Sequence, residues 1–226
     1  MLNSARLRDS GAASCPFCDE IATGEFPARY RERYGVAGRP ASVAAGIVVL
    51  PTISPIASGH ILVLPKGHVT RTADSAGRPS LLRAVEDLRS RFQERFGHEC
   101  YVFEHGVALG GLACGVDHAH IHLVPLPREV IGAVEAQVEL DFPAAFSGAL
   151  DSALERAIME PDATYLLHGT LRRMTITFDH RVPSQYMRQV IARLTSSHHW
   201  DWNTLFGIPE FRQTCTALEV GSLETV

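Results

Sequence analysis

The sequence lacks any apolar run long enough to cross a membrane. The longest run, VAAGIVVLP at residues 43–51, is far shorter than the roughly 20 residues that a transmembrane helix needs. The first residues, MLNSARLRDSGAAS, lack the apolar core of a secretory signal, so residues 1–14 are expected to form a loose polar tail. The net charge is only −4 with neutral histidines, which indicates no general affinity for nucleic acid. We therefore expect neither a membrane nor a nucleic acid as a partner.

Cysteine is also scarce, and its count is odd: five among 226 residues. This count argues against a disulfide framework and favours a reducing, cytoplasmic setting. Two of the cysteines, Cys15 and Cys18, stand close together in CPFC, a spacing used by metal sites and by redox pairs. A redox pair needs a strand directly before the motif, whereas a polar tail precedes it here. A metal site is the better interpretation.

What remains is an ordinary globular composition, with 46% hydrophobic and 20% charged residues, enough for one domain with an extension. Residues 46–51 and 60–65 each form a short apolar run that ends at a proline and predict two neighbouring antiparallel strands. In residues 79–97 the apolar positions recur every three or four residues, which predicts a helix. Residues 100–105 and the histidine run at 118–122 predict two further strands. The expected fold is α+β, an antiparallel sheet with a packed helix.

The pattern weakens after Pro127. We expect a catalytic domain at residues 15–127 and an α/β extension at residues 128–226 that packs on it. Within the extension the sequence predicts two helices, at residues 141–158 and 183–194. It also predicts a pair of strands, at residues 163–169 and 173–180.

The densest chemistry lies in GVDHAHIHLVPLP, where His118, His120 and His122 occupy every second position. In a strand these three rings share one face, and the apolar residues between them share the other. A solvated face would more naturally use Lys, Glu or Thr, so an incidental polar face is disfavoured. Two chemical interpretations remain: a metal site, because imidazole binds zinc well, and nucleophilic catalysis by a neutral imidazole whose second nitrogen is held by an acceptor.

These residues resemble the histidine triad (HIT) superfamily of nucleotidyl hydrolases and transferases, in its zinc-containing Cys-x-x-Cys form. The resemblance covers roughly residues 15–127 through four segments in register: CPFCDEIATGEFPARY, GHILVLPKGH, FEHG and DHAHIHLVP. It implies a HIT-like fold for this part of the chain. Many members of the superfamily are dimers, so a homodimer is a possible assembly.

The resemblance also implies roles for the histidines. His120 would attack the α-phosphorus of a nucleotide-like substrate and carry the nucleotidyl group covalently, and His122 would bind the phosphate or shuttle a proton. In the zinc-containing branches the matching metal ligands are Cys15, Cys18, His68 and His118. Such a Cys2His2 set suits a structural Zn²⁺, which would remove His118 from catalysis.

The chain departs from the family pattern near the triad. Cys114 and Gly115 stand where one branch has Gln-Ser, so a serine hydroxyl is missing. His122 replaces the glutamine of the transferase branch, which by resemblance favours hydrolysis. Glu104 matches a phosphate-binding asparagine and would repel phosphate unless it is turned away or protonated. Main-chain N–H groups of the loop around Gly111, Cys114 and Gly115 are candidates to hold phosphate oxygens.

The extension offers further candidates. Gln185 and Arg188 lie at a predicted helix start, where anions bind, with Ser184 as a helix cap in the alternative interpretation. His60 is expected to be a turn residue, and Trp202 to pack rather than to stack on a base.

Together these features predict a nucleotidyl hydrolase that cleaves a phosphoanhydride or phosphoramidate bond. A nucleotidyltransferase or phosphorylase with the same covalent intermediate is the first alternative. A zinc-stabilised nucleotide-binding protein without turnover is the second, although the complete triad argues against it.

Overall fold

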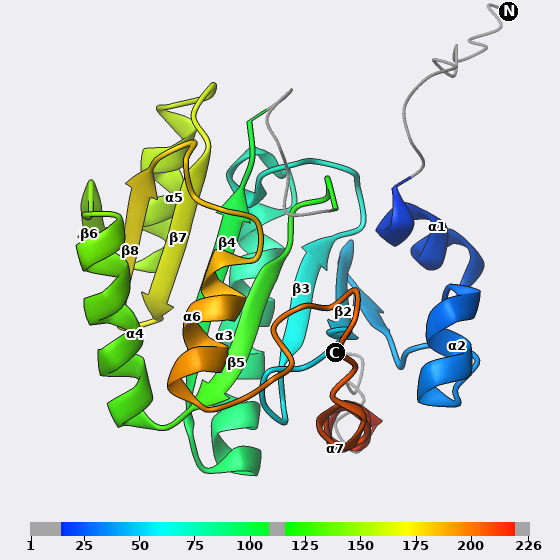
Figure 1. The fold of residues 1–226 in the computed structure, drawn as a ribbon. Coiled ribbons are helices and arrows are strands. Elements are labelled where there is room, and N and C mark those ends of the chain that lie inside the picture. Colours follow the sequence, from blue (N-terminus) through cyan, green and yellow to red (C-terminus); the bar gives the residue numbers. More distant parts are fainter. Residues whose placement is uncertain (1–14, 109–115, 220–226) are drawn as a thin grey trace, which may run out of the picture.

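The computed structural model describes residues 15–108 and 116–219 (Figure 1). Within these residues eight strands form one antiparallel sheet in the order β1-β2-β3-β5-β4-β7-β8-β6, and helices cover both faces. The fold is therefore α+β, as predicted. The strands are β1 Ser42–Ala44, β2 Ile47–Pro51, β3 Ile61–Pro65, β4 Glu99–Gly106, β5 Ile121–Leu126, β6 Phe146–Gly148, β7 Tyr165–Thr170 and β8 Arg173–Phe178.

The helices differ in length and in the sequence signals that mark them. The longest, α3, begins one residue before the predicted position and stops at Gly97, whose φ of 71° is the left-handed conformation that glycine adopts readily at a helix end. The helices are α1 Pro16–Thr23, α2 Ala28–Tyr34, α3 Arg78–Phe96, α4 Arg128–Asp141, α5 Leu150–Ile158, α6 Tyr186–Leu194 and α7 Ile208–Glu219, with a 3-10 turn, η1, at Thr72–Asp74.

Strand alternation divides the core into two layers. On β5, Ile121 and Leu123 point to the face covered by α3 and α5, where the largest apolar cluster lies. Val124 and Leu126 point to the opposite face and pack with α4 and α6. His122 shares this second face, so the core packing of β5 itself determines which way this histidine points.

The segment after Pro127 continues the same sheet. β7 pairs with β4, with Phe103 opposite His168, and β8 pairs with β7. The boundary at residue 127 stays a prediction. One expectation within this segment is wrong: residues 141–158 do not form a single helix, because α4 ends at Asp141 and β6 and α5 follow. Pro143 lies in the break, and a proline disfavours helical conformation in the residue before it.

The sequence signals did not predict α4, nor three helices that lie near one end of the sheet, α1, α2 and α7. α1 packs through Phe17 on the apolar side chains of β2 and β3. α2 and α7 meet in an aromatic cluster in which the rings of Tyr34 and Phe211 have centroids 4.1 Å apart. α1 and α2 have only eight and seven residues, too short for periodicity to distinguish them from loops.

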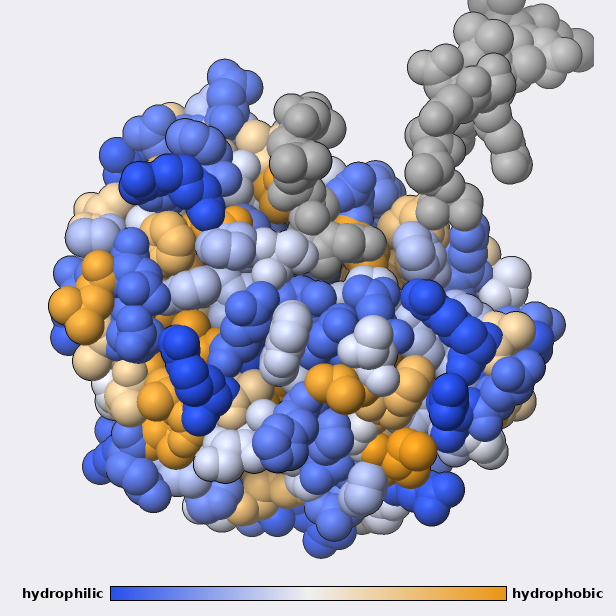
Figure 2. Space-filling model, in the orientation of Figure 1, coloured by the Kyte–Doolittle hydropathy of each residue, from blue (hydrophilic) through white to orange (hydrophobic). Residues whose placement is uncertain are grey.

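The surface seen in Figure 2 is largely hydrophilic, with separate hydrophobic patches. Among the described residues no helix has the length and apolar character that a bilayer crossing requires.

Candidate functional site

The histidine run begins before its strand. β5 starts at Ile121, later than predicted, because the backbone around His118 and His120 is used differently. The N–H of Ala119 donates to the carbonyl of Val69 at 2.7 Å, and the carbonyl of His118 accepts from a side chain instead of from a neighbouring strand. Only His122 lies within the sheet ladder, opposite Phe103 of β4.

His120 has one ring nitrogen fixed and one available. Its Nδ1 lies 2.6 Å from the carbonyl oxygen of His118, so Nδ1 must carry the hydrogen and Nε2 keeps its lone pair. Burial is the largest cause of the shift that lowers the pKa of His120 to about 4. The ring is therefore neutral at pH 7. A neutral imidazole held by a main-chain acceptor is the arrangement that nucleophilic attack requires.

His122 belongs to a buried chain of hydrogen bonds. The N–H of Ile56 donates to Nδ1 of His60 at 3.3 Å, and Nε2 of His60 lies 2.8 Å from Nδ1 of His122. Because His60 accepts at Nδ1, it must donate from Nε2, and His122 in turn must carry its hydrogen on Nε2. The ring of His122 stacks on Phe103 with centroids 4.2 Å apart. His122 is thus a fixed hydrogen-bond donor. His60 closes a turn through its N–H to the carbonyl of Ala57 at 3.2 Å, as expected, and its side chain is also the partner of His122.

The predicted metal ligands form one cluster. The ligand atoms of Cys15, Cys18, His68 and His118 all lie within 4.8 Å of one another. Both sulfurs lie 3.5 Å from Nδ1 of His118, and Cys18 Sγ lies 3.5 Å from Nδ1 of His68. In a tetrahedral zinc site with Zn–S of about 2.3 Å and Zn–N of about 2.0 Å, sulfur and nitrogen ligands lie roughly 3.5 Å apart. The four residues can therefore hold a metal ion.

A second contact orients one of these ligands. Nε2 of His118 donates to the carbonyl of Pro65 at 2.8 Å, which leaves Nδ1 directed at the sulfurs, as is usual for metal-bound histidine. Burial, and next the neighbouring Cys15, raise the pKa of the Cys18 thiol to about 11, so metal binding would have to displace this proton.

The cluster also positions α1 against the triad. Phe17, which lies between the two cysteines, has its ring edge-on to His118 and His120, with centroid distances of 5.8 and 5.4 Å. A metal held by Cys15, which caps α1, and by Cys18 within α1 would therefore keep Phe17 next to His120.

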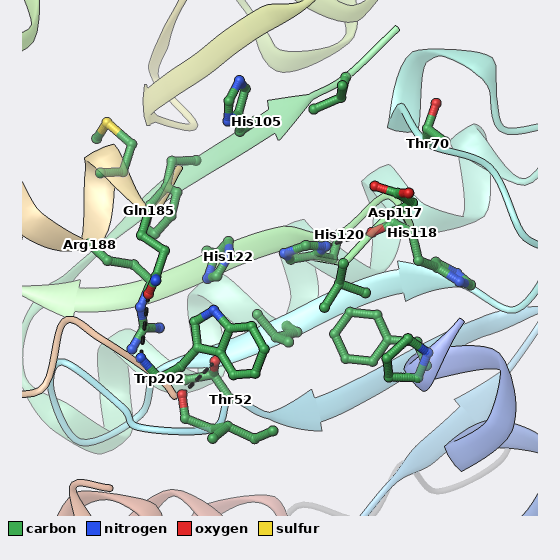
Figure 3. A pocket seen from close by; sticks show the side chains of 18 of the residues that line it. Thr52, Thr70, His105, Asp117, His118, His120, His122, Gln185, Arg188 and Trp202 are labelled. Atoms are coloured by element: carbon green, nitrogen blue, oxygen red, sulfur yellow. Dashed lines mark hydrogen bonds between the residues drawn. The ribbon is translucent and has the colours of Figure 1, made fainter. Parts of the chain in front are cut away.

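A cavity of about 300 Å³ lies in front of the triad (Figure 3). Its walls are largely apolar and come from distant parts of the chain: Phe17 of α1, Tyr30 of α2, His122 of β5, Arg188 of α6, and Trp202. Its volume is at the lower end of the range for small-molecule sites. His120 and His122 both line this cavity, which a substrate can occupy.

The structure brings both predicted residues of the extension to this cavity, but not as a helix-end anion site. α6 begins at Tyr186, so Gln185 and not Ser184 is its capping residue, with a φ of 59° that non-glycine residues rarely adopt. Gln185 accepts from the N–H of Trp202 at 3.4 Å. Arg188 lies in the first turn of the helix and reaches the cavity with its side chain (Figure 3). Gly111, Cys114 and Gly115 lie outside the described residues.

Glu104 is turned away from the cavity. It is 1% exposed, and its carboxylate accepts from the N–H of Thr72 at 2.7 Å and from the hydroxyl of Tyr165 at 2.9 Å. Burial raises the pKa of Glu104 to about 7, against a usual 4.5, although these donors lower it. Because the carboxylate of Glu104 faces Thr72 and Tyr165 and not the cavity, the repulsion of phosphate expected from the sequence does not arise.

Glu104 is expected to make stability depend on pH. Between pH 4.5 and 7 the unfolded chain loses this proton while the folded protein keeps it, so stability falls as pH rises through this window. Relative to Glu104→Gln, which stays uncharged, wild-type protein should lose on the order of 3 kcal/mol of unfolding free energy between pH 4.5 and pH 8. Urea unfolding of both proteins at several pH values measures the difference. A difference independent of pH would contradict the assignment.

Sequence reasoning missed three residues of the site: His60, Tyr30 and Trp202. Trp202 packs in part against the aromatic cluster, as expected, but it also lines the cavity. No local pattern marks it, because it comes from an irregular segment between α6 and α7. The position of His60 directly before an apolar strand was the one available signal for that residue.

Comparison with known proteins gives one family. Residues 45–129 match the HIT domain family model, and no curated protein matches the chain. Among solved structures, a histidine triad nucleotide-binding protein from Candida albicans is 25% identical, with 51% of this chain and 77% of that one covered and a TM-score of 0.38. A HIT family hydrolase from Clostridium thermocellum is 21% identical, with 52% and 94% covered and a TM-score of 0.36. A HIT family protein from Bacillus anthracis is 21% identical, with 52% and 77% covered and a TM-score of 0.40.

Proposed function

Because residues 45–129 form a HIT domain, we propose that the chain is a nucleotidyl hydrolase that works through a covalent intermediate on His120. The observation that carries the proposal is the bond from His120 Nδ1 to the carbonyl of His118, which leaves Nε2 as a neutral nucleophile beside a cavity. Similar proteins are described as nucleotide-binding or as hydrolases, which agrees with a nucleotide-like substrate.

The reaction has two displacements. In the first, the lone pair of His120 Nε2 forms a bond to the α-phosphorus while the bond from phosphorus to the leaving group breaks with its electron pair. The ring becomes positively charged, and the carbonyl of His118 stabilises it through Nδ1–H. In the second, water attacks phosphorus, gives up its proton to solvent, and His120 leaves as a neutral ring.

His122 acts in this proposal as a donor to a phosphoryl oxygen. Its Nε2–H is fixed by the chain from Ile56 through His60. Transfer of that proton would leave an imidazolate, because burial holds the pKa of His122 well below its usual value and the ring is not protonated beforehand. Phosphate binding is thus favoured over proton shuttling. A phosphoanhydride, whose leaving phosphate needs no proton, fits this site better than a phosphoramidate, whose amine does.

We further propose that the cluster of Cys15, Cys18, His68 and His118 holds a structural Zn²⁺, since a Cys2His2 set closes all four positions of a tetrahedral ion. When bound, such an ion fixes the backbone of α1 and of His118 and takes no part in the reaction. A homodimer, a cytoplasmic location and the lack of a nucleic-acid partner stay predictions.

Substrate turnover and the fate of the adduct test the proposal together. Nucleotides, dinucleoside polyphosphates, nucleoside phosphoramidates and sugar nucleotides are screened by product mass, and the reaction with an active substrate is quenched at alkaline pH, where phosphohistidine survives. We expect a nucleotidyl group on the peptide that contains His120. An adduct on another residue, or turnover without any adduct, would contradict the mechanism.

The same adduct separates the alternatives. Isolated nucleotidyl-protein is mixed with water alone or with added phosphate, pyrophosphate or alcohol, and the rate of discharge is followed. A hydrolase discharges at the same rate in all cases, whereas a transferase or phosphorylase discharges at least about tenfold faster with its acceptor. Nucleotide binding without turnover of any compound in the screen would identify the non-catalytic alternative.

A further inference from the structure

The cavity contains a buried cation that no acidic group neutralises. Arg188 is 5% exposed, and its hydrogen bonds within residues 15–108 and 116–219 all go to main-chain carbonyls: Nε to Trp200 at 2.7 Å, and Nη2 to His199 at 3.0 Å and to Ser54. These carbonyls hold the guanidinium in place without cancelling its charge. A buried charge of this kind is costly unless an ion of opposite sign joins it.

A second buried arginine in the same wall shows the contrast. Arg39 also lines the cavity, but the carboxylate of Glu20 accepts from its Nε at 2.8 Å and from its Nη2 at 2.5 Å. Its charge is therefore compensated by the protein itself. The acidic residue whose field reaches Arg188 is Asp201, and its carboxylate is already used by the N–H of Asn203 and the hydroxyl of Thr204. Arg188 keeps its charge available to a ligand.

An unsatisfied donor lies in the wall of the same cavity. Tyr30 of α2 is 2% exposed, and its hydroxyl meets no hydrogen-bond acceptor among the described residues; the neighbouring Arg29, which can only donate, lies over its ring. A buried hydroxyl without a partner loses its hydration without compensation. Tyr30 lines the cavity together with Arg188, so a ligand that occupies this space can supply the missing acceptor.

The position of Arg188 separates it from the reacting centre. In Figure 3, His122 lies between His120 and Arg188, and Gln185 and Trp202 surround the arginine. A ligand that filled the cavity would therefore present different groups to His120 and to Arg188. The segment that leads into β5 supplies the first contact, and α6 of the C-terminal extension supplies the second.

We propose that Arg188 and Tyr30 form an anion subsite, which selects nucleotide-like substrates that carry a second anionic group besides the phosphoryl centre at His120. The shared chemistry is that of anionic oxygens, which a further phosphate or a carboxylate of the leaving group can provide. This inference rests on the proposed function for its view of the substrate, but it concerns binding and is tested by binding alone.

Calorimetry on full-length protein with His120→Ala measures affinity without turnover. Two ligand pairs differ by one anionic group: AMP against ADP, and the adenosine 5′-phosphoramidate of methylamine against that of glycine. The corresponding uridine pairs are measured in parallel. We expect the member with the extra anion to bind about tenfold tighter in at least one pair, as one added charge-assisted contact would give. The pair that responds identifies the source as phosphate or carboxylate.

Variants connect this preference to the two residues. Arg188→Gln should reduce the preference to within about twofold, and Tyr30→Phe should reduce it about threefold while leaving the melting temperature unchanged or higher, because it removes an unsatisfied hydroxyl. Arg181→Gln is the matched control: Arg181 is exposed and paired with Asp179, so the preference should persist.

The outcomes are decisive in both directions. If Arg188→Gln does not fold, Arg188→Lys, which keeps the charge, and Tyr30→Phe carry the test. No preference in any pair, or a preference that both Arg188→Gln and Tyr30→Phe retain, would overturn the anion subsite. Failure of turnover or of adduct formation at His120 would overturn the proposed function and leave these affinities measurable.

Discussion

Replacement of His120 by alanine is expected to lower turnover on the order of 10⁴-fold or more while the protein remains folded. The nucleophile has no substitute, because His118 directs its Nδ1 at the cysteines and His122 has its Nδ1 occupied by His60 and its Nε2 protonated. Loss of a nucleophile typically costs this much, with residual catalysis from binding groups alone. His120 lines the cavity and belongs to neither of the two large apolar clusters, so its replacement should change stability little.

The measurement compares initial rates, adduct formation and thermal unfolding for wild type, His120→Ala and a matched control. His98→Ala is a suitable control because His98 is exposed and lies outside the cavity that holds the triad. The control should retain wild-type turnover, and His120→Ala should form no adduct. Turnover of His120→Ala within tenfold of wild type would remove the covalent mechanism.

The second large effect is expected from the metal cluster. Cys15→Ser should lower metal content from about one zinc per chain to near zero and the melting temperature by on the order of 20 °C or more. Structural zinc supplies roughly 10 kcal/mol or more of apparent binding energy, and in a chain of this size each lost kcal/mol lowers the melting temperature by about 2–4 °C. Elemental analysis and calorimetric melting of purified protein measure both quantities.

Cys215→Ser is the matched control, because Cys215 is a free, partly buried thiol outside the cluster. It should keep its metal and melt near the wild-type temperature. Cys15→Ser should also weaken nucleotide binding, since α1 would no longer hold Phe17 beside His120. An unchanged metal content in Cys15→Ser would eliminate this ligand set.

Local sequence patterns predicted the central strands and the longest helix of the fold. The apolar runs at 46–51 and 60–65 are paired as β2 and β3, and the periodicity at 79–97 is α3. Ile121 lies between two of the histidines and Leu123 follows the last one. Both side chains are buried in the core, as the alternation predicted. The sequence signals did not predict α1 and α2, which are too short to show periodicity. They wrongly predicted one helix across Pro143, where the chain forms β6 and α5 instead.

The candidate site likewise has features that the sequence patterns indicated and features that only tertiary contacts determined. Residue type and spacing marked the Cys-x-x-Cys pair and the alternating histidines as candidate metal ligands or nucleophiles, and the resemblance to the HIT superfamily then divided the proposed roles among them. Only the tertiary structure decided that His60 sets the proton on His122, that Glu104 faces away, and that Arg188 enters the cavity uncompensated. These facts depend on contacts between residues far apart in the chain, and such contacts follow from packing of the whole sheet, which no local pattern records.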